Sequence, residues 1–280
     1  MKNYAYVTLL TTNEFINGVV VLYDSWAKTN SQYPFYCVVS DNISKKNMDI
    51  MKFLGINLIV KEKINMPKEM IQYNLQHLKG CANWYQTFTK FYVFGLEQFD
   101  KIIYLDCDTY LVKNIDEMFD YHHMSGVIDC CGLHEEGESD YLVPGDNYFK
   151  YFNSGVLVIE PSIDLFKDIM KFIDSIVVDQ ILADQVILSK YFYTWKDELH
   201  LHLPVYYNTC VPILHHYLNR PWFNIDDVKI FHFAAAKPWQ KDKGSLNNLE
   251  QQYMEMLFKC VEELGKKGHR SVNLISRNKR

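Results

Sequence analysis

Residues 101–112 have the sequence KIIYLDCDTYLV, in which an apolar run ends in two aspartates one residue apart. The run at 102–105 is rich in β-branched and aromatic residues, which predicts a strand buried on both faces of a sheet. Asp106 and Asp108 follow where this strand leaves the core. Two carboxylates this close repel each other unless a cation lies between them. The segment therefore points to a site for Mg²⁺ or Mn²⁺, whose other ligands are water and substrate phosphates.

The two aspartates also have a simpler interpretation, in which Asp106 caps a turn and Asp108 is solvated. A D-x-D pair by itself does not decide between the two. Its position at the end of a buried strand favours the cation site, and polar groups elsewhere in the chain must complete it.

The pattern before this segment alternates strand and helix. Strands are expected at 4–10, 35–40 and 56–60, and helices at 17–29 and 45–54. This order predicts an α/β fold with right-handed crossovers and a mostly parallel sheet. Residues 62–84 have a mixed, loop-like composition, and 85–96 have helical periodicity. The D-x-D pair then lies at the carboxyl end of a strand, where ligands bind in open α/β sheets.

The second half of the chain continues the alternation. Strands are expected at 126–130, 152–159 and 228–233, and helices after Ser162, at 183–191 and at 246–264, with a charged surface loop at 132–146. A chain of 280 residues can form one large α/β domain, expected at 1–264. Residues 265–280 are rich in basic side chains and lack acids, which predicts a flexible tail.

The composition excludes several classes of protein. The net charge of −5 and the absence of a basic stripe in the body of the chain argue against nucleic acid as a partner. The sequence has neither a signal-peptide pattern nor an apolar run long enough to span a membrane. The seven cysteines lack metal-site spacing and are expected to be reduced thiols. We therefore expect a cytoplasmic protein.

Several short motifs occur in a fixed order at the expected strand ends. They are VTLLTTNEF at 7–15, TFTK at 87–90, DCD at 106–108, FNSGV at 152–156, ADQ at 183–185, and FHF at 231–233 followed by KPW at 237–239. In this order, the chain resembles the glycogenin-type (family 8) retaining glycosyltransferases, which include galactinol synthases and xylan glucuronosyltransferases. The resemblance covers about residues 4–240. It implies the GT-A nucleotide-sugar-binding fold, with a mostly parallel central sheet flanked by helices.

The resemblance also implies roles for individual residues. Asp106, Asp108 and His232 are expected to hold the metal, while Lys90 and Lys237 stabilise the charge that grows on the departing UDP. The expected UDP contacts are Leu9, Thr11, Thr12, Phe15, Lys90, Asp106, Cys107, Asp108, His232, Ala235 and Lys237. The expected sugar contacts are Asn153, Ser154, Asp184 and Gln185, of which Asp184 and Gln185 lie beside the anomeric carbon and are catalytic together with Lys90.

The sequence departs from the family pattern at a few positions. Relatives often have asparagine where this chain has Thr12, and glycine near the position of Ala235. The self-glucosylated tyrosine of glycogenin falls on His215, and Tyr217 lies two residues further on. His200 and His202 alternate on one face of an expected strand, but without an acidic partner they are interpreted as structural.

The expected activity is transfer of a hexose from a UDP-sugar, UDP-glucose before UDP-galactose, to a hydroxyl acceptor with Mn²⁺ or Mg²⁺. The acceptor is a glycan, a polyol, a lipid-linked sugar or a protein, and a homodimer is possible. A nucleotidyltransferase is disfavoured because residues 11–13 form no glycine-rich basic loop. A catalytically silent scaffold is the alternative of another class, and it has no physical need for the charges of Lys90, Asp184 and His232.

Overall fold

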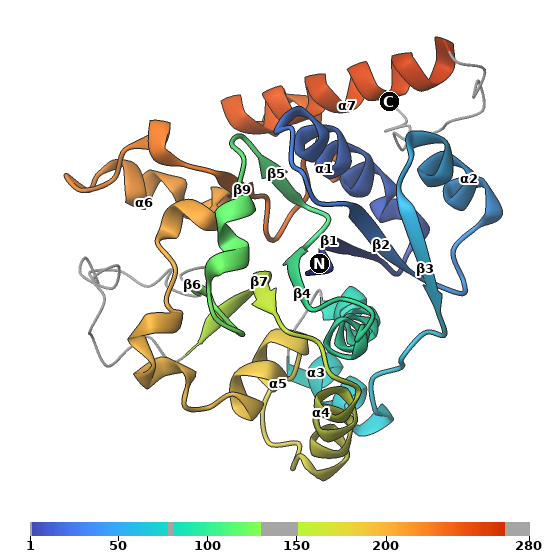
Figure 1. Ribbon diagram of the computed structural model, residues 1–280, viewed down its shortest axis with the longest axis vertical. Helices are drawn as coiled ribbons and strands as arrows, with labels where there is room; N and C mark the ends of the chain where they lie inside the picture. Colours follow the sequence, from blue (N-terminus) through green and yellow to red (C-terminus); the bar gives the residue numbers. More distant parts are fainter. Residues whose placement is uncertain (1, 78–80, 130–150, 267–280) are drawn as a thin grey trace.

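The computed structural model describes residues 2–77, 81–129 and 151–266. The predicted surface loop at 132–146 and all but the first two residues of the predicted tail lie outside these ranges. Figure 1 shows a central sheet with helices packed on both of its faces.

The larger sheet has the strand order β3-β2-β1-β4-β7-β6. Its strands are β1 (Tyr4–Leu10), β2 (Phe35–Ser40), β3 (Asn57–Lys61), β4 (Lys101–Leu105), β6 (Gly126–Ile128) and β7 (Phe152–Ile159). The pairs that join β3, β2, β1 and β4 are all parallel, whereas β7 runs antiparallel to both of its neighbours. The predicted α/β fold with a mostly parallel central sheet is confirmed.

A smaller sheet has the order β5-β9-β8 and lies beside the carboxyl end of β4. Its strands are β5 (Thr109–Leu111), β8 (Thr209–Cys210) and β9 (Ile230–His232). β9 pairs antiparallel with β5, which sets Thr109 opposite His232. This register brings the end of the D-x-D segment next to a histidine from the far end of the chain.

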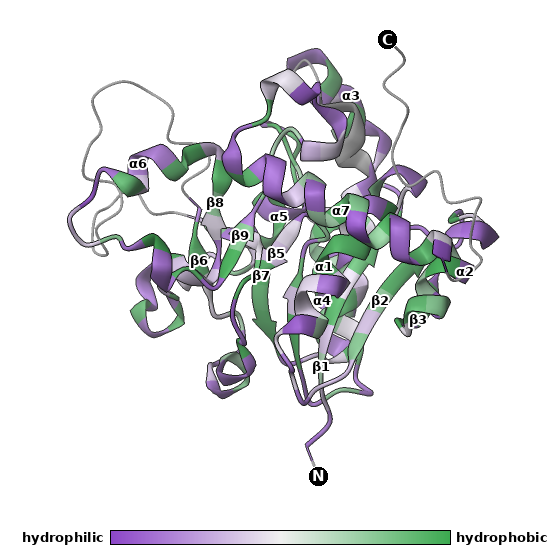
Figure 2. Cartoon of the chain, turned by 90° about the horizontal axis from the view of Figure 1, so that it is seen from above, coloured by the Kyte–Doolittle hydropathy of each residue, from purple (hydrophilic) through white to green (hydrophobic). Residues whose placement is uncertain are grey.

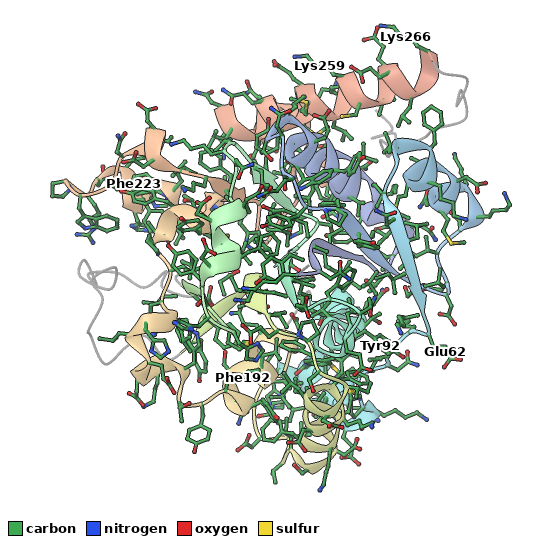
Figure 3. The ribbon with its side chains drawn as sticks, viewed as in Figure 1. Glu62, Tyr92, Phe192, Phe223, Lys259 and Lys266 are labelled. Atoms are coloured by element: carbon green, nitrogen blue, oxygen red, sulfur yellow. The ribbon has the colours of Figure 1, made fainter. Side chains whose placement is uncertain are left out.

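The helices divide between the two faces of the larger sheet. One hydrophobic cluster joins side chains of α1 (Ile16–Lys28), α2 (Lys45–Leu54) and α7 (Asn248–Lys266) to one face. A second cluster joins α3 (Lys68–His77), η2 (Cys81–Gly95), α4 (Ile163–Ser175) and α5 (Asp184–Tyr191) to the other. Figure 2 shows the central strands as hydrophobic, and Figure 3 shows Lys259 and Lys266 pointing away from the body of the protein on α7. Both faces of the sheet are therefore covered, as its continuous apolar strands require.

The remaining described elements are short. They are α6 (Leu214–Leu218) and the 3₁₀ helices η1 (Asn13–Phe15), η3 (Asp116–Asp120), η4 (Trp195–Asp197), η5 (Leu199–Leu201), η6 (Val205–Tyr207), η7 (Val211–Ile213), η8 (Ile225–Asp227), η9 (Pro238–Gln240) and η10 (Lys243–Ser245). Within the described ranges, no helix is long and apolar enough to cross a membrane.

Some expectations were wrong in detail. The loop-like segment 62–84 contains α3, and the helical pattern at 85–96 belongs to the 3₁₀ helix η2. His200 lies in η5 rather than in a strand, and His202 stacks on Trp195 with ring centroids 4.1 Å apart. Cys37, Cys107 and Cys260 are free thiols, as expected, but Cys210 is disulfide-bonded.

Candidate active site

The D-x-D turn is fixed between the two sheets by backbone hydrogen bonds. The Asp106 N–H donates to the Gly155 carbonyl at 2.7 Å on β7, and the Phe233 N–H donates to the Asp108 carbonyl at 2.9 Å, just past β9. Inside the turn, the Thr109 hydroxyl donates to the Asp106 carbonyl at 2.7 Å. The turn is therefore held from both sides, and its two carboxylates have defined positions.

Asp106, Asp108 and His232 form a cluster whose ligand atoms all lie within 4.8 Å of one another. The nearest approach between Asp108 and the imidazole is 3.3 Å, from Nε2 to Oδ1. Gly155 makes room for the ring, because a Cβ at this position would lie 2.4 Å from His232 Cε1. Two carboxylates and one imidazole suit Mn²⁺ or Mg²⁺, so the residues present fit the divalent cation that the sequence predicts.

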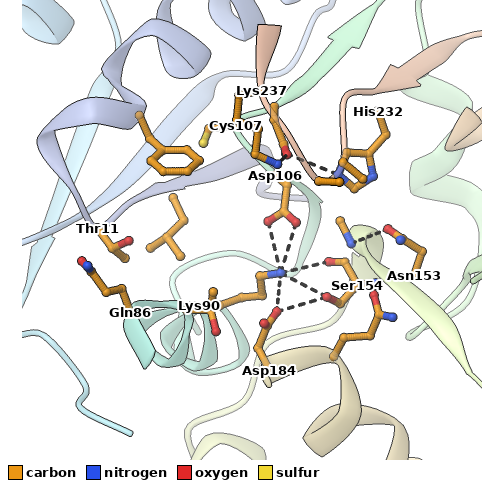
Figure 4. A pocket seen from close by; sticks show the side chains of 18 of the residues that line it. Thr11, Gln86, Lys90, Asp106, Cys107, Asn153, Ser154, Asp184, His232 and Lys237 are labelled. Atoms are coloured by element: carbon orange, nitrogen blue, oxygen red, sulfur yellow. Dashed lines mark hydrogen bonds and ion pairs between the residues drawn. The ribbon is translucent and has the colours of Figure 1, made fainter. Parts of the chain in front are cut away.

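Lys237 forms an ion pair with the second oxygen of Asp108 (Figure 4). Burial opposes ionisation of Asp108, but above all the charge of Lys237 outweighs burial and holds the pKa of this carboxyl far below its ordinary value. Asp108 is therefore a carboxylate throughout the physiological pH range. Burial and the two neighbouring aspartates raise the pKa of the Cys107 thiol, which therefore stays protonated between them.

Lys90 is a buried cation between two carboxylates. Its ammonium lies 2.6 Å from Asp184 and 3.1 Å from Asp106. Burial acts to lower the pKa of Lys90, but attraction to Asp106 and Asp184 outweighs it and raises the pKa above its ordinary value. The Tyr104 hydroxyl donates to Asp106 at 2.5 Å. Lys90 therefore stays charged. It links Asp106, a member of the predicted metal site, to Asp184.

Asp184 and Gln185, at the start of α5, are tied to β7. The Ser154 hydroxyl donates to Asp184 at 3.1 Å, and the Ser154 N–H donates to Gln185 Oε1 at 3.0 Å. Burial opposes ionisation of Asp184, but Lys90 outweighs it and lowers the pKa of this carboxyl. Gln185 Nε2 donates to Asp129 at 2.8 Å, and Asn153 Nδ2 donates to the other Asp129 oxygen at 3.1 Å.

All of the predicted site residues line a single cavity of about 610 Å³ (Figure 4). Leu9, near the carboxyl end of β1, and Thr11, Thr12 and Phe15, just beyond it, form one part of the lining. Among the described residues, the buried Thr12 hydroxyl has no hydrogen-bond partner, so this part of the cavity offers a polar group to a ligand. The Phe15 ring lies edge-on to Trp239, with centroids 5.9 Å apart, which fixes its orientation.

Ala235 has a left-handed backbone, with a φ of 63°. An L-residue in this conformation costs about 1–2 kcal/mol relative to the right-handed one, whereas glycine adopts it freely. The conformation gives a physical reason for the glycine that the family resemblance places near this position. The small methyl group of Ala235 still lines the cavity.

Several residues at the site were not predicted from the sequence. Gln86, Thr87, Tyr104, Gly155, Ala234 and Gln240 also line the cavity. Asp129 and Asn208 contact the predicted residues Asn153 and His232 through hydrogen bonds. Gly155 was within a quoted motif, but Asp129 and Asn208 lie in none of the motifs at 7–15, 87–90, 106–108, 152–156, 183–185 and 231–239.

The mostly parallel sheet, with an acidic pair at the end of a central strand and a cavity beside it, matches the GT-A fold of solved glycosyltransferases. The family model for "Glycosyl transferase family 8" matches residues 6–243. The chain therefore belongs to glycosyltransferase family 8.

Curated relatives and solved structures agree with this assignment. Galactinol synthase 4 of Arabidopsis thaliana is 24% identical over 90% of this chain and 78% of its own. Galactinol synthase 1 of Solanum lycopersicum is 27% identical over 91% of this chain and 79% of its own. The galactosyltransferase LgtC, solved with donor and acceptor sugar analogs, has the same fold, with a TM-score of 0.64 at 16% identity over 94% of this chain and 99% of its own.

Proposed function

We propose that the protein is a metal-dependent, retaining hexosyltransferase that moves a sugar from a UDP-sugar to a hydroxyl acceptor. The observation that carries this proposal is the cluster of Asp106, Asp108 and His232, which line the cavity and whose ligand atoms lie within 4.8 Å of one another. Family membership supports the class of reaction, and the cluster supports its dependence on a divalent metal.

The charges of the cavity match a sugar diphosphate. A divalent cation held by Asp106, Asp108 and His232 supplies the charge that neutralises the two phosphates. Lys237 and Lys90 are buried cations on either side of this cluster, and fixed cations stabilise charge that develops on a leaving group. We assign the uridine to the part of the cavity lined by Leu9, Thr11 and Phe15.

Asp184 and Gln185 are assigned to the reacting sugar. Asp184 accepts from Lys90 at 2.6 Å and from Ser154 at 3.1 Å, so one of its oxygens is saturated by hydrogen bonds. Such a carboxylate is a weakened nucleophile, but its negative charge can still stabilise a cationic sugar. We propose this electrostatic role for Asp184, as the partner of an oxocarbenium-like transition state.

The names of the relatives bear on the donor. The matched plant proteins are galactinol synthases, and LgtC is a galactosyltransferase. We therefore place UDP-galactose ahead of UDP-glucose as the donor, reversing the order expected from the sequence. For the acceptor we propose a polyol or glycan hydroxyl.

The function is tested by incubating purified protein with UDP-galactose or UDP-glucose, with Mn²⁺ or EDTA, and by measuring UDP release. We expect release with one of these donors and Mn²⁺, and none with EDTA. Asp108→Asn should abolish it, because the variant removes one charged metal ligand while it keeps the size of the side chain.

The matched control is Asp164→Asn on α4, where the side chain is 90% exposed. This variant should retain full activity. Release that continues in EDTA or in Asp108→Asn would contradict the assignment of the metal site. Absence of metal-dependent UDP binding by calorimetry would instead favour a silent scaffold.

A further inference from the structure

His232 contacts a different partner at each ring nitrogen. Nε2 faces Asp108 at 3.3 Å, and Nδ1 lies 2.9 Å from the side-chain oxygen of Asn208. Both His232 and Asn208 are buried, with exposed fractions of 4% and 3%. In a buried imidazole, the nitrogen that carries the proton depends on whether the partner at each ring nitrogen can accept or donate a hydrogen bond.

The orientation of the Asn153 amide is fixed from two sides. The Gly155 N–H can only donate, and it lies 3.0 Å from one end of the amide, which must therefore be the oxygen. The other end lies 3.1 Å from an Asp129 carboxylate oxygen, which as an ionised group only accepts, so this end must be the NH₂ group. The two neighbours require the same orientation.

The orientation of Asn208 follows from that of Asn153. Asn208 approaches the Asn153 oxygen at 2.8 Å, so the Asn208 group at this contact is its NH₂ donor. The carbonyl oxygen of Asn208 then faces His232 Nδ1. Because an amide oxygen cannot donate, the proton of this hydrogen bond belongs to Nδ1.

We infer that Asn208 is a positioning residue for the metal site, which holds a proton on Nδ1 of His232 and so reserves Nε2 for the cation. This inference rests on the proposed function, in which Nε2 is a metal ligand. Without Asn208, the Asp108 carboxylate at 3.3 Å would be the remaining acceptor beside the ring, and it would favour a proton on Nε2, the nitrogen that the metal needs. Hydrogen bonds of this kind orient histidine ligands and tune metal affinity.

The first test observes the protons of the imidazole directly. Protein labelled with ¹⁵N-histidine is studied by two-bond ¹H–¹⁵N correlation spectra, without metal and with Mg²⁺ and UDP. We expect a protonated Nδ1 on His232 in both samples. His202 provides an internal reference of the opposite kind, because its Nε2 lies 3.0 Å from the Trp195 carbonyl and must donate to it. An unprotonated Nδ1 on His232 in wild-type protein overturns the inference.

The second test uses two variants of Asn208. Asn208→Leu has a similar shape without an acceptor, and we expect unprotonated Nδ1 to appear and Mn²⁺ affinity to fall by roughly 10- to 100-fold. Asn208→Asp keeps the acceptor toward Nδ1 but loses the NH₂ donor to Asn153, so it should keep the Nδ1 proton and recover part of the affinity. Mn²⁺ affinity is measured from the electron paramagnetic resonance signal of the free ion.

The matched control is Asn74→Leu. Asn74 is equally buried, but it bonds to the backbone of Leu182, away from His232. The Asn74→Leu variant should have a lower melting temperature than wild type, without a change in the ¹H–¹⁵N signals of His232. If Asn208→Leu folds and keeps both the Nδ1 proton and the Mn²⁺ affinity, Asn208 has no positioning role. Neither readout requires sugar transfer, so a failed transferase assay and a failed inference are distinguishable.

Discussion

Lys237 forms an ion pair with Asp108, which is a ligand of the proposed metal. Substitution of Lys237 should therefore have opposite effects on the binding of metal and on the binding of UDP. The ammonium pairs with Asp108 and competes there with any other cation. A diphosphate offers Lys237 an alternative anion. Lys237 is therefore expected to oppose binding of the metal alone and to favour binding of the metal with UDP.

We predict that Lys237→Met raises Mn²⁺ affinity in the absence of UDP and lowers UDP affinity in the presence of Mn²⁺, the latter by roughly 10- to 100-fold, as for a lost charged hydrogen bond. Titrations followed by electron paramagnetic resonance and calorimetry measure the two affinities. Lys241→Met, in which the altered residue pairs with Glu250 instead, is the control and should change neither. A parallel fall of both affinities in Lys237→Met would show that the lysine only supports the fold of the loop.

The sequence identified the residues that line the cavity better than it identified the contacts among them. Asp106, Asp184 and His232 are within motifs, so their types and positions alone predicted a common site. The network through Asp129 and Asn208 could not be predicted, because Asp129 follows β6, Asn208 precedes β8, and both meet Asn153 only in the folded chain. The left-handed backbone of Ala235 could not be predicted either, because alanine rarely adopts this conformation.

At the scale of elements, α1 packs closely against the D-x-D turn at Gly18. A Cβ at this position would lie 2.4 Å from the Cys107 carbonyl oxygen and 2.9 Å from the Trp239 ring. The absence of a side chain at Gly18 is therefore what lets the start of α1 approach the turn that carries both aspartates. Helix and turn cannot move independently.

We predict that Gly18→Ala destabilises the protein by about 1–3 kcal/mol, as overpacking does, and weakens Mn²⁺ binding by displacing the turn. Chemical denaturation and metal titration measure the two effects. The control is Gly244→Ala, because a Cβ there meets nothing within 4 Å. Gly18→Ala protein with wild-type stability would show that α1 can shift without loss.

Elements with a clear buried pattern were predicted well, and elements that are very short or mostly exposed were predicted poorly. The pattern placed β1 and β2 at their observed bounds because each is a continuous buried run. β5 and β8 have three and two residues, too few to show any periodicity, and only their pairing with β9 makes them strands. The helix α3 was missed because its composition is mixed and only Met70 and Asn74 are buried.

At the scale of the whole molecule, a histidine links folding stability to pH. His123 Nδ1 accepts the Glu160 N–H at 3.0 Å just beyond β7, which requires an unprotonated nitrogen. Burial lowers the pKa of His123; Glu160 opposes this effect, and Lys101 adds to it. The folded state therefore binds this proton less readily than the unfolded state does.

We predict that the contribution of His123 to stability is fully present above the ordinary histidine pKa of about 6.5 and is lost as the pH falls below it. Denaturant melts between about pH 7.5 and 5 should show a smaller decline for His123→Gln than for wild type. His122→Gln, at an exposed neighbour, is the control and should follow wild type. An identical decline in all three proteins would exclude His123 as a source of the pH dependence.

The pairing of β5 with β9 joins parts of the chain that are distant in sequence, and Asp108 and His232 stand at this junction. A ligand bound by both side chains acts as a reversible cross-link between the two strands. Because folding has already closed the long loop between them, the ligand stabilises the pairing without a further loss of loop entropy. Substrate occupancy would then lengthen the lifetime of the small sheet. Without bound donor, we expect proteases to cleave the segment around β9 before the rest of the described chain.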